Sequence, residues 1–596
     1  MRSNDTMSET RRSRRGFLKA ATLGSAAVVL RPSTLVGQEP SRRFLGDGVG
    51  AYGERSPFEA SMRRVRESRW DQAAGSQTPL QDLRGSITPS ALHFERHHAG
   101  IPEIDPAQHR LLIDGLVARP LVITMAEIER LPAVSRIYFL ECSGNSRVKW
   151  SPAQPDTDAQ AAFGMTSCSE WTGVPLSVLL REAGVCAEAR WLVAEGADAC
   201  RMTRSVPLEK ALDDTLVAYG QNGEALRPAQ GYPLRLLIPG WEGNISIKWL
   251  RRLQLVDRPY MTREETSKYT DLMPNGEARQ FTFAMDAKSV ITRPSGGQRL
   301  DEPGFYQISG LAWSGRGRCG VSRSPPMAAD RGLRPSCKSR FCPWRTRGSV
   351  SIGPGMGRTR RWPPAASTRP ATCSRRERPW SPCGAHNRAI TTTRSRVGAC
   401  VRTERWRTSM SDRVLKAAAG VLFAAMLVTT LVAQTPTTGL GRPARPVEIE
   451  AWGSIIGPDG AGLPPGRATA ADGRPVYARQ CARCHGPTGR EGPDTRLAGG
   501  QGSLEGDQPQ KTVGSYWPAA TTLWDYVNRA MPFDQPGVLT AGEVYGTVAY
   551  VLYLNDVVGI DDPIDAATLP AIEMPNRDGF VPDARPDIAP TASPGL

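Results

Sequence analysis

The five residues at 481–485, CARCH, decide the fold of the C-terminal part of this 596-residue chain. Two thiols separated by two residues and followed at once by an imidazole are the pattern for covalent attachment of a c-type haem. Cys481 and Cys484 would form the thioethers, and His485 would bind the iron. A zinc or redox CxxC pair has the same spacing, but the export signals described below favour haem.

The sequence on either side of this motif predicts an all-α domain over residues 446–580. Residues 476–479 (VYAR) predict a helix that leads into the haem motif. Residues 540–543 (TAGE) have the form of a capping box that opens an amphipathic helix. About one loop before that helix comes Met531, in RAMP at 529–532. This order resembles class I c-type cytochromes and implies that Met531 is the sixth iron ligand, with Met574 as the alternative.

Two segments have the composition of export signals. Residues 13–19 (SRRGFLK) and the apolar stretch 20–30 indicate a twin-arginine signal over residues 1–45. Residues 410–434 contain Met410, basic residues and the apolar run 417–432. This second segment is either another signal peptide or, if it stays uncleaved, a short membrane anchor. Both interpretations predict an exported, periplasmic haem domain.

Residues 318–409 differ from the rest of the chain in composition. Between 318 and 408 there are 21 lysines and arginines and 3 acidic residues, although the whole chain carries a net charge of only +16. Such a charge run is typical of a nucleic-acid or membrane-surface module, or of a disordered linker. We favour a third interpretation. Shifted codons for residues 351–359 can encode DWAWDGTD, which indicates a frameshift near Arg318 that fused two genes. This segment is then a disordered, out-of-frame linker, and no nucleic-acid partner is expected.

A single cysteine stands at the end of a predicted strand in the N-terminal half. Residues 136–140 (RIYFL) are rich in β-formers, and ECSGN at 141–145 follows them. Cys142 therefore lies where the strand opens into a glycine-containing loop, and its thiol can reach a ligand there. From the residues alone, a buried and inert cysteine is equally compatible with this position.

The stretch from 94 to 249 resembles the sulfite oxidase family of molybdenum enzymes at several ordered points. The motifs are FERHH at 94–98 with PEIDP at 102–106, FLECSGN at 139–145, WTGVPL at 171–176, YGQNGE at 219–224, GYPLR at 231–235, and PG at 239–240 with KW at 248–249. The resemblance implies an α+β molybdopterin-binding fold over 78–280. It also implies an immunoglobulin-like dimerisation domain, of which only the start, 281–317, precedes the abnormal segment. Homo-oligomer formation through that truncated domain is expected to be impaired.

The same resemblance assigns roles to individual residues. It implies that Cys142 ligates molybdenum through its thiolate. Arg96 would face an anionic substrate, and Tyr269 would be the active-site tyrosine. The residues that would hold the pterin and its phosphate are His97, His98, Arg235 and Lys248. Judged without the resemblance, Arg235 could instead pair with a carboxylate, and Tyr269 could pack as aromatic cover.

One departure from the family bears on the substrate. Eukaryotic members carry an arginine where this chain has Ser146, and fewer fixed positive charges suit a bulkier substrate than free sulfite. The resemblance is greatest to the sulfane dehydrogenase branch, which oxidises sulfane sulfur on a cysteine of a carrier protein beside a c-type cytochrome. We therefore expect a sulfur dehydrogenase that passes electrons through haem c to a soluble cytochrome c. Oxidation of free sulfite, or a haem carrier with a non-functional molybdenum half, are the alternatives.

Overall fold

The computed structural model describes residues 48–150, 157–300, 304–316, 341–350 and 439–584. The chain divides into two units, residues 1–60 and 61–596, and the helices and strands of the described residues lie in the second. Both predicted export segments fall outside the described residues. Within the described ranges, no helix has the length and apolar character that a membrane span requires.

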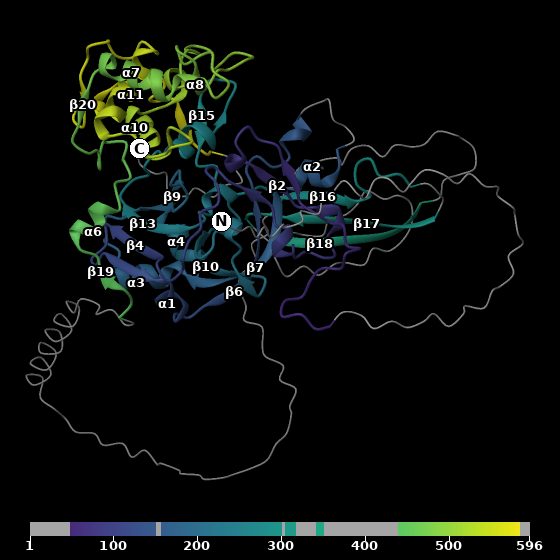
Figure 1. The fold of residues 1–596 in the computed structure, drawn as a ribbon. Helices are drawn as coiled ribbons and strands as arrows, with labels where there is room; N and C mark the ends of the chain where they lie inside the picture. Colours follow the sequence, from purple (N-terminus) through teal and green to yellow (C-terminus); the bar gives the residue numbers. More distant parts are fainter. Residues whose placement is uncertain (1–47, 151–156, 301–303, 317–340, 351–438, 585–596) are drawn as a thin grey trace, which may run out of the picture. The chain divides into compact units, whose positions relative to one another are not determined.

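Two sheets form the N-terminal half of the described chain (Figure 1). They share one hydrophobic core. One has the strand order β19-β5-β4-β13-β8-β9, and the other has β11-β10-β7-β6, with β12 also paired to β10. The bounds in chain order are β4 Arg110–Gly115, β5 Leu121–Thr124, β6 Val134–Glu141, β7 Thr166–Pro175, β8 Trp191–Gly196, β9 Thr203–Pro207, β10 Leu216–Gln221, β11 Glu224–Ala225, β12 Arg235–Leu237, β13 Leu250–Val256 and β19 Arg442–Pro443.

Short helices connect these strands, and two of them, α1 and α2, begin at a residue whose side chain caps the helix. Helix α1 (Met125–Glu129) starts with a capping box between Thr124 and Glu127. Helix α3 (Leu176–Ala183) packs its leucines into the shared core and ends at Gly184, whose φ of 70° is left-handed. The remaining elements of this half are α2 Ala159–Phe163, α4 Leu208–Asp213, β1 Arg64–Arg66, β2 Gly75–Gln77 and β3 Glu95–Arg96. A mixed α+β fold is therefore confirmed for this half.

A third sheet follows where the truncated dimerisation domain was expected. Strands β16 (Lys288–Arg293), β17 (Gly304–Trp313) and β18 (Phe341–Val350) lie side by side in antiparallel order (Figure 1). Strand β18 lies inside the segment 318–409 that we expected to be disordered, so ten residues of that segment are placed in a strand. Most of the rest of the segment is outside the described residues, and the frameshift stays a prediction.

The C-terminal half is mainly helical, as predicted, but it is not all-α, because β20 (Arg467–Ala468) and β21 (Ile564–Asp565) form a short antiparallel sheet. Helix α7 (Ala470–Gln480) leads into α8 (Ala482–His485), and α11 (Ala541–Tyr553) opens with the expected capping box. Helices α7 and α11 touch through two glycines, since a Cβ on Gly473 would lie 1.7 Å from the carbonyl oxygen of Gly546. The other helices are α9 Val513–Tyr516 and α10 Ala520–Ala530.

Both ends of the helical half add strands to sheets of the first half. Strand β19 pairs with β5, and β22 (Phe580–Pro582) pairs in parallel with β15 (Ala278–Gln280), which itself pairs with β14 (Asp271–Leu272). Helix α6 (Pro446–Ala451) follows β19. The helical half is thus tied to the first half by backbone hydrogen bonds at two places.

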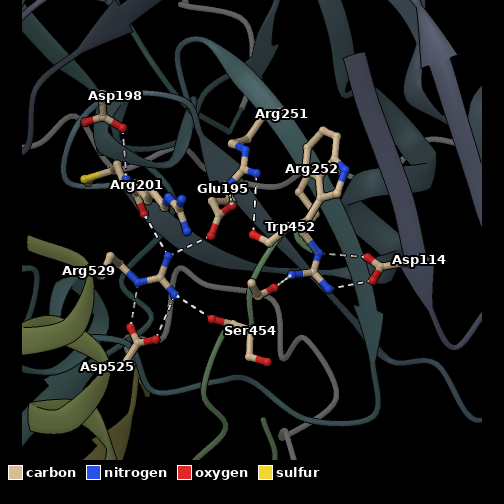
Figure 2. A network of polar contacts seen from close by, with 12 residues as sticks. Asp114, Glu195, Asp198, Arg201, Arg251, Arg252, Trp452, Ser454, Asp525 and Arg529 are labelled. Carbon is tan, nitrogen blue, oxygen red and sulfur yellow. Dashed lines mark hydrogen bonds and ion pairs between the residues drawn. The ribbon is translucent and has the colours of Figure 1, made fainter. Parts of the chain in front are cut away.

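Buried charges hold the two halves together between these strands (Figure 2). Arg529, at the end of α10, binds Asp525 on its own helix and Glu195 on β8, at 2.7 Å each. Arg252 binds Asp114 at 2.6 Å and donates to the Gly453 carbonyl at 2.7 Å. These groups are nearly inaccessible to water, so their geometry fixes how α10 lies on strands β8 and β13.

Candidate active site and haem site

Strand β6 positions Cys142 at the opening of a cavity. The strand pairs with β7 along its whole length, from Val134 opposite Gly173 to Glu141 opposite Thr166. One residue later the Cys142 N–H donates to the Met165 carbonyl at 3.0 Å, and the chain turns back so that Asn145 N–H donates to the Cys142 carbonyl at 2.9 Å. The predicted position at a strand end is confirmed, and the half-buried thiol lines the cavity.

The cavity brings together residues from His93 to Tyr269, which are 176 positions apart in the chain. They come from β3 and its flanking residues, from the end of β6, from the loop between β8 and β9, from β12 and the turn before it, from the turn before β13, and from the residue after a π-helical turn, Glu264–Lys268. Every molybdenum-site residue predicted from the sequence lines this one cavity, namely Arg96, His97, His98, Cys142, Arg235, Lys248 and Tyr269. The structure thus supports their grouping, while their individual roles remain predictions.

Buried cations dominate one wall of the cavity. Arg235 is 2 % exposed and donates to the Gln230 and Ser246 carbonyls, while its buried Nε has no partner among the described residues. Burial lowers the pKa of Arg235 to about 9, and burial together with the Arg235 charge lowers the pKa of Lys248. Within the described chain, neither side chain forms an ion pair with a carboxylate. Uncompensated buried cations are costly, so this wall fits an anionic group such as a phosphate.

His97 is held as a neutral ring against these cations. The Lys248 ammonium donates to His97 Nδ1 at 2.8 Å, so Nε2 carries the proton and faces Glu95 Oε2 at 3.0 Å. Burial, followed by the charges of Lys248 and Arg96, lowers the pKa of His97 to about 3. Arg96 is fixed by donation to the Ala73 carbonyl at 2.9 Å and to the His97 carbonyl.

Tyr269 and His98 contribute neutral hydrogen-bonding groups. The Tyr269 hydroxyl lies 3.4 Å from His98 Nε2, and the Arg204 guanidinium lies 5.4 Å from the phenol ring. Burial raises the pKa of Tyr269 and lowers that of His98 to about 3. At neutral pH the phenol is therefore protonated and can donate a hydrogen bond into the cavity.

The surroundings of Cys142 have opposing effects on the ionisation of its thiol. Burial raises its pKa, whereas the Gly144 backbone N–H and the Arg96 charge both lower it. A bound metal ion would favour the thiolate further, because a coordinating thiol loses its proton. The donor set therefore fits a soft metal centre bound through one protein sulfur, with its anionic organic part on the wall of Arg235 and Lys248.

Ser146 is not among the residues that line the cavity, and the expectation about substrate charge stays a prediction. Its backbone has a φ of 65°, and its hydroxyl donates to the Asn145 carbonyl at 2.5 Å. Several polar cavity residues were not assigned to the site from the sequence, among them His93 and Asn244. Asn244 donates to the Ser143 hydroxyl at 3.2 Å. The only sequence signal for them was their place beside the FERHH and PG motifs.

The haem motif has the geometry that iron binding requires. His485 Nδ1 lies 2.8 Å from the Thr495 carbonyl, so this nitrogen donates and Nε2 remains for a metal. Burial lowers the pKa of His485, which favours the neutral, ligating ring. Cys481 and Cys484 lie at either end of the first turn of α8 and are half-buried.

Both candidate sixth ligands belong to or pack against the hydrophobic cluster that Cys481 also contacts, so the choice of Met531 over Met574 stays a prediction. The guanidinium of Arg483, inside the haem motif, binds Asp534, three residues after Met531. The Met531 side chain is half-buried and packs against the same cluster as Cys481. Met574 is 3 % exposed inside the helical core. Two residues after Met574, the Asn576 side chain donates a hydrogen bond to the Tyr516 carbonyl.

Two family matches cover the two sites. Residues 98–264 match the family described as oxidoreductase molybdopterin binding domain, and residues 468–551 match cytochrome C oxidase, cbb3-type, subunit III. Together the matches imply a molybdenum cofactor in the first half and haem c in the second.

Similar proteins match the first half of the chain. It is 33 % identical over 273 residues to an NADH nitrate reductase from Ulva prolifera, which is 41 % of this chain and 32 % of that protein. It is 31 % identical over 249 residues to the mitochondrial sulfite oxidase of Drosophila melanogaster, which is 39 % of this chain and 43 % of that protein. This chain therefore spans less than half the length of these two relatives.

A solved structure is also similar, the sulfane dehydrogenase SoxCD from Paracoccus pantotrophus. The identity is 43 %, over 52 % of this chain and 82 % of that chain, with a TM-score of 0.48. The two family matches, the identity to sulfite oxidase and the grouped cavity residues identify a molybdopterin-binding oxidoreductase domain of the sulfite oxidase type, followed by a cytochrome c domain at the C-terminal end.

Proposed function

We propose that the chain oxidises a sulfur compound at the cavity around Cys142 and delivers the electrons through haem c to a soluble cytochrome c. The observation that carries this proposal is the pairing of a thiol with uncompensated buried cations in one cavity, on the same chain as a covalent haem motif. The cofactor that fits the cavity would supply two-electron oxidation with oxygen transfer, and haem c would carry the electrons singly.

The residues of the cavity have separate tasks in this proposal. Cys142 holds the metal, and the charge of Arg96 favours its thiolate. Arg235 and Lys248 bind the anionic part of the cofactor, because their charges lack carboxylate partners in the described residues. Tyr269, protonated at neutral pH, donates a hydrogen bond towards the reacting oxygen atoms. Arg96 orients the anionic substrate.

For the substrate, we favour sulfane sulfur on a cysteine of a carrier protein over free sulfite. Ser146 supplies no positive charge to the cavity, which suits a substrate less charged than sulfite. The 43 % identity to a protein named sulfane dehydrogenase supports the same choice. Export signals at 1–45 and 410–434 support a periplasmic location, where soluble cytochrome c is the acceptor.

Purified full-length protein tests the proposal directly. Molybdenum and haem are measured per chain, and the haem absorption spectrum is followed after addition of sulfite, or of a carrier protein bearing a cysteine persulfide. We expect one molybdenum and one haem, with haem reduction by the persulfide carrier faster than by sulfite.

The outcomes separate the alternatives. Faster reduction by sulfite would make the enzyme a sulfite dehydrogenase. Absence of molybdenum, or no haem reduction by either compound in molybdenum-loaded protein, would contradict the proposal and leave a haem electron carrier. Nitrate offered to the dithionite-reduced protein is the control for the reaction named in the nitrate reductase relatives, and it should leave the haem reduced.

A further inference from the structure

Arg69 and Trp70, which precede the first strands of the cavity, reach into the haem domain. The Trp70 ring lies 5.2 Å from the ring of Phe533, and Arg69 Nη1 lies 3.2 Å from Asp494 Oδ2. The Arg69 guanidinium also lies 5.5 Å from the Trp70 ring. These two neighbours therefore touch two separate loops of the haem domain.

Both loops adjoin the haem motif. The Asp494 N–H donates to the Cys484 carbonyl at 3.0 Å, which places this loop against the haem-binding turn. Phe533 follows Met531 by two residues, on the loop that Arg483 holds through Asp534. Arg69 and Trp70 thus contact the protein on the cysteine side and on the methionine side of the proposed haem.

In the other direction, Trp70 is close to the cavity along the chain. It precedes the short 3-10 turn Asp71–Ala73, and the Ala73 carbonyl accepts the hydrogen bond from Arg96 Nη1 at 2.9 Å. The next carbonyl, of Ala74, accepts from the His97 N–H at 3.0 Å. Arg96 and His97 both line the cavity, so three residues and one hydrogen bond separate the Trp70 ring from its wall.

Other aromatic contacts between the halves lead elsewhere. Trp452 stacks at 4.4 Å on Arg251, a residue of β13, next to the ion pairs of Figure 2. Tyr526, on α10, lies 4.3 Å from the Arg263 guanidinium. In the described part of the chain, neither ring pairs with an aromatic ring or a cation of residues 481–485 or 531–534. Among these aromatic contacts in the described residues, that of Trp70 with Phe533 adjoins the haem motif, and the chain that follows Trp70 leads to the Ala73 carbonyl that holds Arg96.

We infer that Trp70 is a positioning residue that holds the haem edge against the segment leading to Arg96, and that electrons cross between the two sites at this contact. The inference rests on the proposed function and deepens it. With both cofactors bound, one electron from the molybdenum centre would reduce one ferric haem to ferrous haem, and Trp70 itself would be neither oxidised nor reduced. An indole suits this place because its ring packs on Phe533 at little conformational cost.

The test measures electron transfer inside the full-length holoenzyme without any sulfur substrate. A light flash in the presence of a flavin photoreductant reduces the haem, and its reoxidation by the molybdenum site is then followed by absorbance. We expect Trp70→Leu to slow this equilibration about tenfold. Trp70→Phe, which keeps an aromatic ring, should recover most of the rate. The haem spectrum, haem content and thermal unfolding should match the parent protein.

Trp452→Leu is the matched control, since it removes a tryptophan from the same junction away from the haem loops. An unchanged rate in Trp70→Leu would overturn the inference, as would equal slowing in Trp452→Leu, which would indicate general loosening. Slowing by Tyr526→Leu with a normal rate in Trp70→Leu would also overturn it in favour of the Arg263 contact. Failure of every sulfur compound to reduce the parent haem would refute the proposed function but leave this measurement valid.

Discussion

The two cofactor sites of this chain are built in opposite ways. The haem-motif residues Cys481, Cys484 and His485 lie within five consecutive residues on one turn, whereas the molybdenum cavity draws its walls from six separate segments. A site made from neighbouring residues depends on one helix and one loop. A site assembled from distant segments depends on the whole sheet arrangement, so substitutions should affect the two sites very differently.

The largest expected effect comes from the thiol of the assembled site. Cys142→Ser should abolish haem reduction by sulfur compounds, because a serine hydroxyl does not supply the soft anionic ligand that the metal requires. The haem spectrum after dithionite should be unchanged, since the haem domain has its own ligands. Cys186→Ser is the matched control, a half-buried cysteine that does not line the cavity. Retained turnover in Cys142→Ser would refute the assignment.

The next largest effect concerns the haem site, whose proposed sixth ligand, Met531, lies outside the CARCH motif. Met531→Leu should lower the haem reduction potential, because loss of the thioether removes the ligand that raises it. Met574→Leu, a volume-conserving change in the core, should leave the potential unchanged and cost less than about 1.5 kcal/mol of stability. Potentiometric titration of the haem absorbance distinguishes the two. A fall in potential only in Met574→Leu would reverse the ligand assignment.

The sequence predicted the local features well. The strand at 136–140, the helix into the haem motif and the capping box at Thr540 all appear as β6, α7 and α11. Each has a local cause, either β-branched and aromatic composition or a side chain that caps a nearby N–H. The grouping of the cavity residues came from a family resemblance, because no periodicity connects Arg96 with Tyr269.

The contacts between the halves could not be predicted from the sequence. Strands β19 and β22 pair through backbone groups, which leave no signature in side-chain composition. The π-helical turn before Tyr269 and the contact of Trp70 with Phe533 depend on how distant segments pack. Ion pairs such as that of Arg529 with Glu195 join residues more than 300 positions apart, so only the folded chain identifies the partners.

Arg529 forms ion pairs with both halves of the chain, and its removal tests most directly what holds the two halves together. Arg529→Gln leaves Glu195 and Asp525 buried with less compensation, and should lower the free energy of unfolding by about 3–5 kcal/mol. Arg442→Gln is the control, because water screens the exposed pair of Arg442 with Glu448 and its loss should cost far less stability. Denaturant unfolding measures both. Equal losses would mean that the buried network of Figure 2 does not hold α10 on β8.

The last effect is a pH dependence of stability that originates mainly at the cavity. Burial lowers the pKa of His93 from 6.5 to about 3, so the folded protein keeps this ring neutral where the unfolded chain takes up a proton. Stability is therefore fully present above pH 6.5 and falls as the pH drops towards 3, by about 1.4 kcal/mol per pH unit for each such histidine. His97 and His98 act in the same direction.

His93→Gln isolates one of these contributions, since glutamine can still donate to the Phe94 carbonyl that His93 Nδ1 contacts at 3.0 Å. Between pH 6 and 4, the free energy of unfolding of this variant should fall less steeply with decreasing pH than that of the parent, by about 1.4 kcal/mol per unit. Between pH 7 and 8 the two proteins should show the same pH dependence. Identical slopes below pH 6 would show that His93 is protonated in the folded state. The haem side should contribute less, because His485 is half-buried and its ring already donates to Thr495.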